Sequence, residues 1–255
     1  MTPGIPHGRR RAWLTAVVLA SLLASQPAGA EIHAPLAPPG RPASAFPKPD
    51  RPIAEIISPV WATEKERDAV DEAGQVARML NVGPGLVVAD LGAGSGYHTV
   101  RMAKLVGPSG RVIAEDVMPL YLSGLQRRVD QLRLANVTVA RGEPHDPRLP
   151  PGSVDVALLV HMYHEIAQPF AFLHNLAPAM RPAGRVGIID LDRETHLHGT
   201  PPALLRCELA ALGYRELEFR QLTGNIGYLA VFEAPSPAAL PEPGGVKPCS
   251  SARSG

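Results

Sequence analysis

Residues 87–100 read VVADLGAGSGYHTV, a short apolar run followed by an acid, a glycine-rich turn and the start of a helix. Glycines at 92, 94 and 96 let the backbone turn tightly and approach a ligand, and the next helix begins with free N–H groups. A dinucleotide-binding turn needs glycine where Tyr97 stands, and a P-loop needs a Lys-Ser/Thr pair that is absent. The stretch therefore predicts a strand–turn–helix ligand site of another kind.

Around this stretch, apolar segments of strand length alternate with segments of helical periodicity. We expect strands near 86–89, 112–114, 137–139, 154–160, 186–189, 217–222 and 228–232, and helices near 63–80, 102–106, 120–134, 170–180 and 201–212. Such strands indicate an α/β fold with a mostly parallel seven-stranded sheet covered on both faces. The Thr223-Gly224-Asn225 turn predicts that the last two strands form an antiparallel hairpin at one edge.

The composition restricts the class of protein and divides the chain. In 255 residues, 25 Lys and Arg face 24 Asp and Glu, which disfavours a nucleic-acid binder because such a protein needs clustered positive charge. Residues 31–59 are rich in proline and predict an extended leader, 60–234 a single compact domain, and 235–255 a disordered tail. We expect Cys207 to be a buried small side chain, and a bridge to Cys249 in the tail would stabilise little.

Residues 1–30 predict a signal peptide. Arg9 to Arg11 precede the apolar run 12–24, and Ala28-Gly29-Ala30 offers small residues for cleavage before residue 31. As a helix this run would span about 20 Å, less than the roughly 30 Å of membrane hydrocarbon, so we expect no stable membrane anchor. The Arg10-Arg11 pair resembles a twin-arginine signal, and we expect an exported, periplasmic protein.

The pattern acid-x-Gly-x-Gly-x-Gly resembles the first motif of the class I methyltransferases that use S-adenosylmethionine. The later passage LAPAMRPAGRVGIID is similar to that family's fifth-strand motif, and DLGAGSGY, VHMYHEI and HGTPP resemble a narrower group of exported methyltransferases. The resemblance covers about residues 62–233. It implies a Rossmann-like three-layer sandwich, S-adenosylmethionine as cofactor, and cofactor contacts at Asp90, Gly92, Ala93, Gly94 and Gly96.

The same resemblance implies further cofactor contacts on acidic side chains. A carboxylate at the end of the second strand suits the two adjacent ribose hydroxyls, and the family pattern puts Asp116 there. Strand alternation would turn Glu115 to the other face, which makes it the second candidate. After the third strand, Glu143 could accept the adenine amino group, with Asp146 as its competitor.

In the family that this sequence resembles, the residues at the end of the fourth strand form the fourth motif and face the methyl group. In this sequence that position reads VHMYHEI. The candidate catalytic residues are His164, His161 and Tyr163, with Glu165 beside them. His164 suits a general base because imidazole titrates near neutrality, although a strand-capping role is an equal alternative. Tyr163 could simply wall the pocket.

Other clusters of polar residues have less specific functional interpretations. HMYHE fits neither zinc pattern HExxH nor HxxEH, so we expect no catalytic metal. Asp190, Asp192, His196 and His198 predict a substrate rim or a solvated loop. Trp61, Arg67, Asp68, Asp71 and Glu72 precede the first strand, where this family often carries a lid, and a solvated helix face explains their charges equally well.

Four functions compete at this point, and one of them, an unrelated nucleotide-binding oxidoreductase, is disfavoured by Tyr97. A methyltransferase acting on a small molecule is favoured. GSGYHTV followed by VGPSGRV also resembles the protein L-isoaspartate methyltransferases, whose Ser/Thr-containing entry motif has only a faint counterpart in Ile57-Ser58-Pro59. A non-catalytic exported binding module is the third, because S-adenosylmethionine is made in the cytoplasm. The acceptor and the oligomeric state leave no pattern in the sequence.

Overall fold

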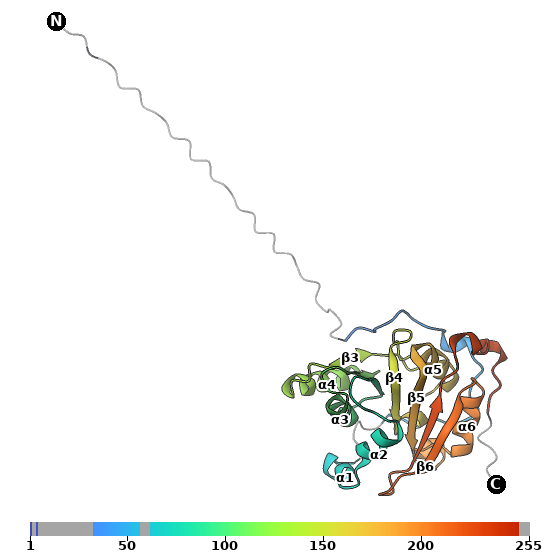
Figure 1. Cartoon of the computed structure of the whole chain (residues 1–255). Coiled ribbons are helices and arrows are strands. Elements are labelled where there is room, and N and C mark those ends of the chain that lie inside the picture. Colours follow the sequence, from blue (N-terminus) through green and yellow to red (C-terminus); the bar gives the residue numbers. More distant parts are fainter. Residues whose placement is uncertain (2–3, 5–32, 57–61, 250–255) are drawn as a thin grey trace. The chain divides into compact units, whose positions relative to one another are not determined.

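The computed structural model describes Met1, Gly4 and residues 33–56 and 62–249. Within this part, seven strands form one sheet in the order β3-β2-β1-β4-β5-β7-β6 (Figure 1). The strands are β1 (Val87–Leu91), β2 (Arg111–Asp116), β3 (Val137–Arg141), β4 (Val154–Val160), β5 (Met180–Asp190), β6 (Arg215–Gln221) and β7 (Tyr228–Glu233). Strands β1 to β5 run parallel, and β7 pairs antiparallel with both β5 and β6, which confirms the predicted mixed sheet with its edge hairpin.

Helices cover both faces of the sheet, so the fold is the predicted three-layer sandwich (Figure 1). They are α1 (Glu64–Ala69), α2 (Glu72–Met79), α3 (Tyr97–Val106), α4 (Pro119–Gln131), α5 (Pro169–Leu176) and α6 (Pro202–Ala210). Helices α2 and α3 pack with Val88 of β1 and α4 packs with Ala114 of β2, whereas α5 and α6 pack with Leu91 on the opposite face. Consecutive side chains of a strand thus enter different layers, as the pleat requires.

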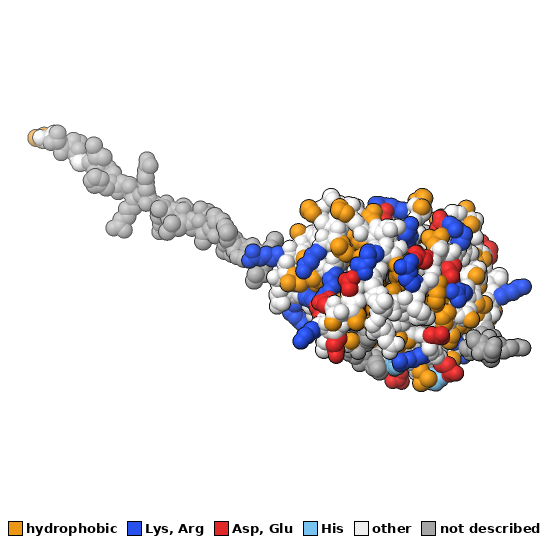
Figure 2. Space-filling view, turned by 60° about the horizontal axis from the view of Figure 1, so that its bottom comes forward, with side chains coloured by type: hydrophobic (Ala, Val, Ile, Leu, Met, Phe, Trp, Pro, Cys, Tyr) orange, Lys and Arg blue, Asp and Glu red, His pale blue; other side chains and the backbone are white. Residues whose placement is uncertain are grey.

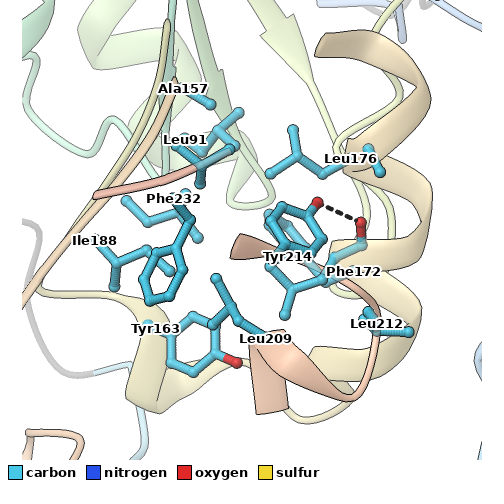
Figure 3. Close-up of a cluster of buried hydrophobic side chains, with 14 of the residues drawn as sticks. Leu91, Ala157, Tyr163, Phe172, Leu176, Ile188, Leu209, Leu212, Tyr214 and Phe232 are labelled. Carbon is cyan, nitrogen blue, oxygen red and sulfur yellow. Dashed lines mark hydrogen bonds between the residues drawn. The ribbon is translucent and has the colours of Figure 1, made fainter. Parts of the chain in front are cut away.

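The larger apolar cluster lies between the central strands and α5 and α6. Figure 3 shows its aromatic members, among them Tyr163, Phe172 and Phe232, interleaved with leucines from both helices. The buried Tyr214 hydroxyl donates to the carbonyl of Leu173 (2.7 Å), so its one polar atom is satisfied inside the core. This packed layer lies against β4 and holds the strand that leads into the site.

The predicted helix at 63–80 is in fact two helices. Its start is as expected, because Thr63 and Glu66 form a reciprocal capping box. The chain then breaks at Val70 and Asp71, where Asp71 takes a left-handed conformation (φ 51°). Helical periodicity continues across the break, which is why the sequence pattern does not reveal it. The break lets α1 turn toward the glycine-rich loop.

The two terminal segments make contacts with the domain that their composition did not predict. Residues 33–56 pack against the domain: Gly40 N–H donates to Asp146 (2.7 Å), and Arg51 is buried against α6. Residues 235–249, predicted to be disordered, contain two short 3-10 helices, and Cys249 forms a disulfide with Cys207 of α6. Composition missed both because the contacts are long-range. The predicted signal peptide lies outside the described residues, Met1 and Gly4 apart.

The exterior mixes charges of both signs. On the face in Figure 2, Lys and Arg side chains are interspersed with Asp and Glu and with single apolar residues. A search of the helices in the described ranges finds none whose length and apolar character would allow it to cross a bilayer.

Candidate functional site

A cavity of about 640 Å³ opens at the carboxyl ends of β1, β2 and β4, a size typical of small-ligand sites. The glycine-rich loop lines one end of it, and the residues that follow β4 and β5 line the other. This is where a parallel sheet of this kind places its ligand. We call the two parts the glycine-loop end and the His164 end.

The glycine-rich loop has the shape that its sequence predicted. Gly92, Gly94 and Gly96 all have positive φ (65°, 53° and 83°). A Cβ on Gly96 would lie 2.4 Å from Leu125 Cδ1, and one on Gly92 would lie 3.0 Å from Met162 Cγ, so side chains are excluded by space as well as by conformation. Ala93 lines the cavity beside them, and its N–H donates to the Glu115 carbonyl (2.8 Å).

Asp90 and Asp116 lie on either side of this loop. Asp116 Oδ2 accepts from Gly94 N–H and Oδ1 from Met118 N–H, both at 2.9 Å, which fixes the carboxylate at the cavity wall. Burial raises the pKa of Asp116, and those backbone N–H groups oppose the shift. Asp90 accepts a 2.5 Å hydrogen bond from Thr99 Oγ1, and burial raises its pKa as well. A carboxylate has about four lone-pair sites, so Asp116 retains acceptors for a ligand.

Glu115 also lines the cavity, so alternation does not remove it from the site. Burial, reinforced by the neighbouring Asp116 carboxylate, raises the pKa of Glu115 well above its ordinary value. Its Oε1 has no hydrogen-bond partner among the described residues, and a Cβ on Gly142 would lie only 1.8 Å from that oxygen. Gly142 thus makes room for the Glu115 side chain at the cavity wall.

The two candidates for the adenine contact separate. Glu143 lines the cavity, but its carboxylate is half-exposed and ion-paired with Arg148 (2.5 Å). Asp146 does not line the cavity; its carboxylate accepts from the N–H groups of Gly40 and Arg148 and so fastens the leader. Of the two, only Glu143 is placed to reach a ligand.

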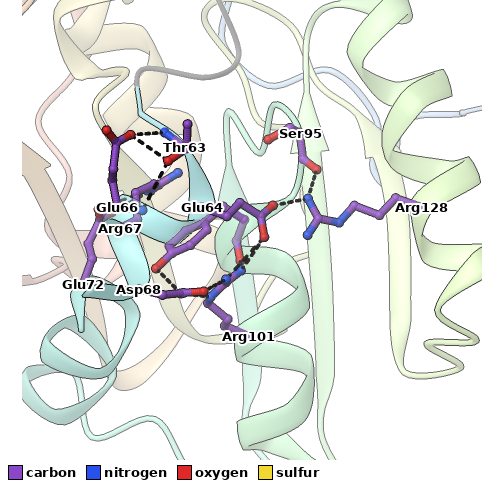
Figure 4. A network of polar contacts seen from close by, with 10 residues as sticks. Thr63, Glu64, Glu66, Arg67, Asp68, Glu72, Ser95, Arg101 and Arg128 are labelled. Atoms are coloured by element: carbon purple, nitrogen blue, oxygen red, sulfur yellow. Dashed lines mark hydrogen bonds and ion pairs between the residues drawn. The ribbon is translucent and has the colours of Figure 1, made fainter. Parts of the chain in front are cut away.

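A polar network ties α1 to the glycine-rich loop (Figure 4). Arg101 pairs with Glu64 and Asp68 of α1, and Arg128 bridges Glu64 to the Ser95 carbonyl (2.5 and 2.9 Å). Tyr97 closes the network, because its hydroxyl donates to Asp68 (2.9 Å). Helix α1, which carries the lid candidates Arg67 and Asp68, is therefore joined to the loop that would hold a cofactor.

The lid candidates divide between site and surface. Arg67 lines the cavity, pairs with the fully buried Glu72 and lies 3.7 Å from the Tyr97 ring centroid. Burial raises the pKa of Glu72, but hydrogen bonds from His98 and Arg67 outweigh burial and lower it to about 2. Asp71 is exposed and pairs with Arg78. Trp61 lies outside the described residues.

At the other end, His164 is held by Asp190. Its Nδ1 lies 3.0 Å from both Asp190 carboxylate oxygens, which also accept from Thr200 Oγ1 (2.7 Å) and Leu191 N–H (2.9 Å). Because a carboxylate only accepts, Nδ1 carries the proton and the lone pair is on Nε2. His164 is 3% exposed and lines the cavity, as do Glu165 and His198.

Three residues close to His164 in the sequence differ in whether they line the cavity. His161 lines the cavity, and burial lowers its pKa to about 4, so it is neutral. Glu165 lines the cavity, and burial raises its pKa to about 7. Tyr163 does not: it is fully buried on the opposite side, where its hydroxyl donates to Glu208 (2.8 Å). The prediction that Tyr163 is catalytic or walls the pocket is therefore wrong, because the turn after β4 directs it into the core.

The cluster predicted after β5 also divides. Asp190 is the fully buried partner of His164, rather than part of a rim. His198 lines the cavity in a left-handed conformation (φ 58°), with its ring centroid 5.5 Å from that of His164. Neither Asp192 nor His196 lines the cavity, and His196 pairs with Glu194.

Sequence reasoning missed the contribution of the leader. Arg51 donates to Glu208 (2.9 Å) and to the carbonyls of Tyr163 and Ile166, at either end of the 3-10 turn η2 (Tyr163–Glu165) that carries His164. Ala54 N–H donates to the His164 carbonyl (3.2 Å). The sequence signal for this contribution is an arginine within a proline-rich segment. Its partners are more than 100 residues away, so no local pattern predicts them.

Comparison with known proteins gives the site its context. Residues 88–184 match the "Methyltransferase domain" family. The chain is 30% identical over 113 residues to the protein-L-isoaspartate O-methyltransferase of Methanothrix thermoacetophila, covering 43% of this chain and 50% of that protein. It is 29% identical over 159 residues to the arsenite methyltransferase of Halobacterium salinarum, covering 60% and 39%. The chain thus spans half or less of the length of these relatives.

Among solved structures, an S-adenosylmethionine-dependent methyltransferase from Aquifex aeolicus shares the fold. Its TM-score is 0.58 at 23% identity, and the match covers 69% of this chain and 98% of that one. The matched family region contains the glycine-rich loop, Glu115, Asp116 and His164.

Proposed function

We propose that this chain transfers a methyl group from S-adenosylmethionine to a small-molecule acceptor at the His164 end of the cavity, because residues 88–184 match a methyltransferase domain family and contain the glycine-rich loop that lines the cavity. One observation carries the proposal: a single cavity joins the glycine-rich loop to a histidine oriented by a buried carboxylate. Cofactor and acceptor can then meet inside one enclosure.

The glycine-loop end supports a bound donor. Asp116 offers lone pairs to the ribose hydroxyls, and Glu115 lies next to it with an oxygen that has no hydrogen-bond partner among the described residues. Glu143 is placed to contact the adenine amino group, and the glycines allow the backbone to approach the nucleoside closely. The acidic groups around the cavity also suit a positively charged sulfonium.

The His164 end supports an acceptor with an O–H, N–H or S–H group. A sulfonium methyl group is already electrophilic, so the protein has to align the acceptor and remove its proton. Asp190 orients the His164 ring, and in the metal-free protein the lone pair on His164 Nε2 can accept that proton. Because His164 is only 3% exposed, the acceptor atom must enter the cavity, which favours a small molecule.

The test combines donor binding with turnover. We expect S-adenosylhomocysteine formation with at least one of a set of phenol, amine and thiol acceptors, and we expect His164→Ala to retain donor affinity while losing turnover. Product on an isoaspartyl peptide alone would favour a protein acceptor, in line with the Methanothrix relative. Tight donor binding with no turnover on any acceptor would favour a non-catalytic binding module.

We further propose that the protein is exported. Arg9 to Arg11, the apolar run 12–24 and Ala28-Gly29-Ala30 support this, and the Cys207–Cys249 disulfide suits an oxidising compartment. Expression in a bacterial host followed by mass spectrometry of the periplasmic fraction tests it. A chain that begins at residue 31 is expected there, and a full-length chain confined to the cytoplasm would contradict export.

A further inference from the structure

Three side chains at the His164 end converge on one point. His164, Glu165 and His198 each offer one metal-ligating atom, and these atoms all lie within 4.8 Å of one another. We propose that they form a binding site for a divalent transition-metal ion of the Zn²⁺ class. The sequence pattern predicted no metal because His198 is contributed by a separate segment after β5 and completes no local motif.

The ligand types select the ion. Two imidazoles with one carboxylate are typical of Zn²⁺, Co²⁺ and Fe²⁺ sites, whereas Mg²⁺ and Ca²⁺ prefer oxygen ligands only. Three protein ligands leave at least one coordination position open, as in catalytic metal sites. All three residues line the cavity, so a small molecule in the cavity can reach that position.

The surroundings of His164 match those of a metal ligand. Metal-binding histidines usually donate their second ring nitrogen to a carboxylate, which fixes the tautomer and orients the ring. Asp190 does this at Nδ1 and leaves the Nε2 lone pair for the ion. Thr200 and the Leu191 N–H hold Asp190 in turn, so the orienting carboxylate is itself fixed.

His198 is also held in place. It adopts a left-handed conformation immediately after the 3-10 turn η4 (Thr195–Leu197), and its N–H donates to the Thr195 carbonyl (3.2 Å). The buried Thr195 hydroxyl donates to the Pro52 carbonyl of the leader (2.5 Å). Non-glycine residues in this conformation are uncommon and are found preferentially at functional sites. The leader therefore supports both histidines, since Ala54 also contacts the His164 backbone.

The role of the ion in catalysis rests on the proposed function, whereas binding of the ion does not. An acceptor O–H bound to the ion is acidified and releases its proton to water. The acceptor oxygen then attacks the methyl carbon as the C–S bond breaks, and the electron pair of that bond stays on sulfur to give S-adenosylhomocysteine. His164 Nε2 cannot hold an ion and a proton together, so in the loaded protein His164 is a ligand and not the base.

The experiment measures metal binding without donor or acceptor. Tag-free protein is stripped with a chelator and titrated with Co²⁺, followed by visible absorption, and with Zn²⁺, followed by calorimetry. We expect one ion per chain and no displacement by excess Mg²⁺. Glu165→Gln and His198→Ala should each weaken Zn²⁺ binding by at least about tenfold, and Asp190→Asn by roughly 10–100-fold as an orienting residue.

His196→Ala is the matched control. This histidine lies two residues before His198, is about half-exposed and pairs with Glu194 outside the cavity, so its loss should leave Zn²⁺ affinity unchanged. Equal affinity in wild type and His198→Ala, no Zn²⁺ binding by well-folded wild type, or displacement of Co²⁺ by Mg²⁺ would each overturn the proposal. Failure of donor binding with Zn²⁺ binding intact would instead contradict the proposed function alone.

Discussion

The two ends of the cavity are built in different ways. The glycine-loop end comes mainly from residues 90–97 and the end of β2, and backbone N–H groups hold its key carboxylate. The His164 end combines the turn after β4, Asp190 of β5, His198 of the following loop and the leader through Arg51. The glycine-loop end therefore depends on a local sequence motif, whereas the His164 end depends on contacts between segments far apart in the chain.

The largest expected effect breaks the glycine-loop end. Gly94→Arg should abolish detectable binding of S-adenosylhomocysteine, because Gly94 has φ 53° and lines the cavity, where a long side chain fills the donor site. Calorimetry measures the loss. Gly124→Arg is the control, since a Cβ there meets only the end of the Arg127 side chain at 3.9 Å. Wild-type affinity in Gly94→Arg would contradict donor binding at this loop.

The next effect breaks the His164 end. Arg51→Ala leaves the fully buried Glu208 without its ion pair and frees the turn that carries His164. Removing one partner of a buried pair costs about 3–5 kcal/mol, so we expect a loss of that size in the free energy of unfolding by denaturant titration. Arg78→Ala, which breaks an exposed pair with Asp71, should change it by less than about 1 kcal/mol. Equal effects of the two variants would show that the leader does not support the site.

The sequence predicts features that depend on local patterns better than features that depend on long-range contacts. The order of strands and helices, the edge hairpin, the glycine turn and Asp116 were predictable, because each depends on periodicity or on a motif within a few residues. The break at Asp71 was not, because helical periodicity crosses it. The direction of Tyr163 was not either, because the 3-10 turn after β4 sets it, and the prediction relied on the position of this segment in the family's fourth motif.

The least predictable features join segments far apart in the chain. Arg51 reaches Glu208, Asp190 orients His164, and Cys249 pairs with Cys207. No local composition encodes such pairs, and a proline-rich or small-residue segment looks disordered until its partner is known. The position of Glu115 belongs here too, since strand alternation predicted that it faces away from the site, whereas the space left by Gly142 admits it to the cavity wall.

A smaller effect sharpens the choice between the two adjacent acids. Asp116→Asn should weaken donor binding about tenfold or more, because a hydrogen bond to a charged group contributes about 1.5–3 kcal/mol and 1.4 kcal/mol is tenfold. Glu115→Gln should change it far less, because burial raises the pKa of Glu115, which disfavours its charged form, and an amide has nearly the same shape. Calorimetric affinities of the two variants decide. The reverse order would assign the ribose contact to Glu115.

The smallest effect concerns pH. Burial lowers the pKa of His161 to about 4 from its ordinary 6.5, so the folded state binds fewer protons than the unfolded state between these values. The stability contributed by neutral His161 is present above pH 6.5 and is lost as the pH falls toward 4. We expect this loss to be at most about 1.4 kcal/mol per pH unit. His161→Asn, which tolerates the left-handed conformation, should flatten the dependence in thermal unfolding. An unchanged slope would show that His161 does not titrate with unfolding.

The most direct test of the central claim is calorimetric titration of the purified protein with S-adenosylmethionine and S-adenosylhomocysteine, in wild type and in Asp116→Asn. We expect micromolar binding of both ligands to wild type and weaker binding to the variant, since the Asp116 carboxylate lies at the cavity wall beside the glycine-rich loop. No binding of either ligand to well-folded wild type would mean that this loop is a structural turn only, and it would contradict the assignment of the cavity as a methyl-donor site.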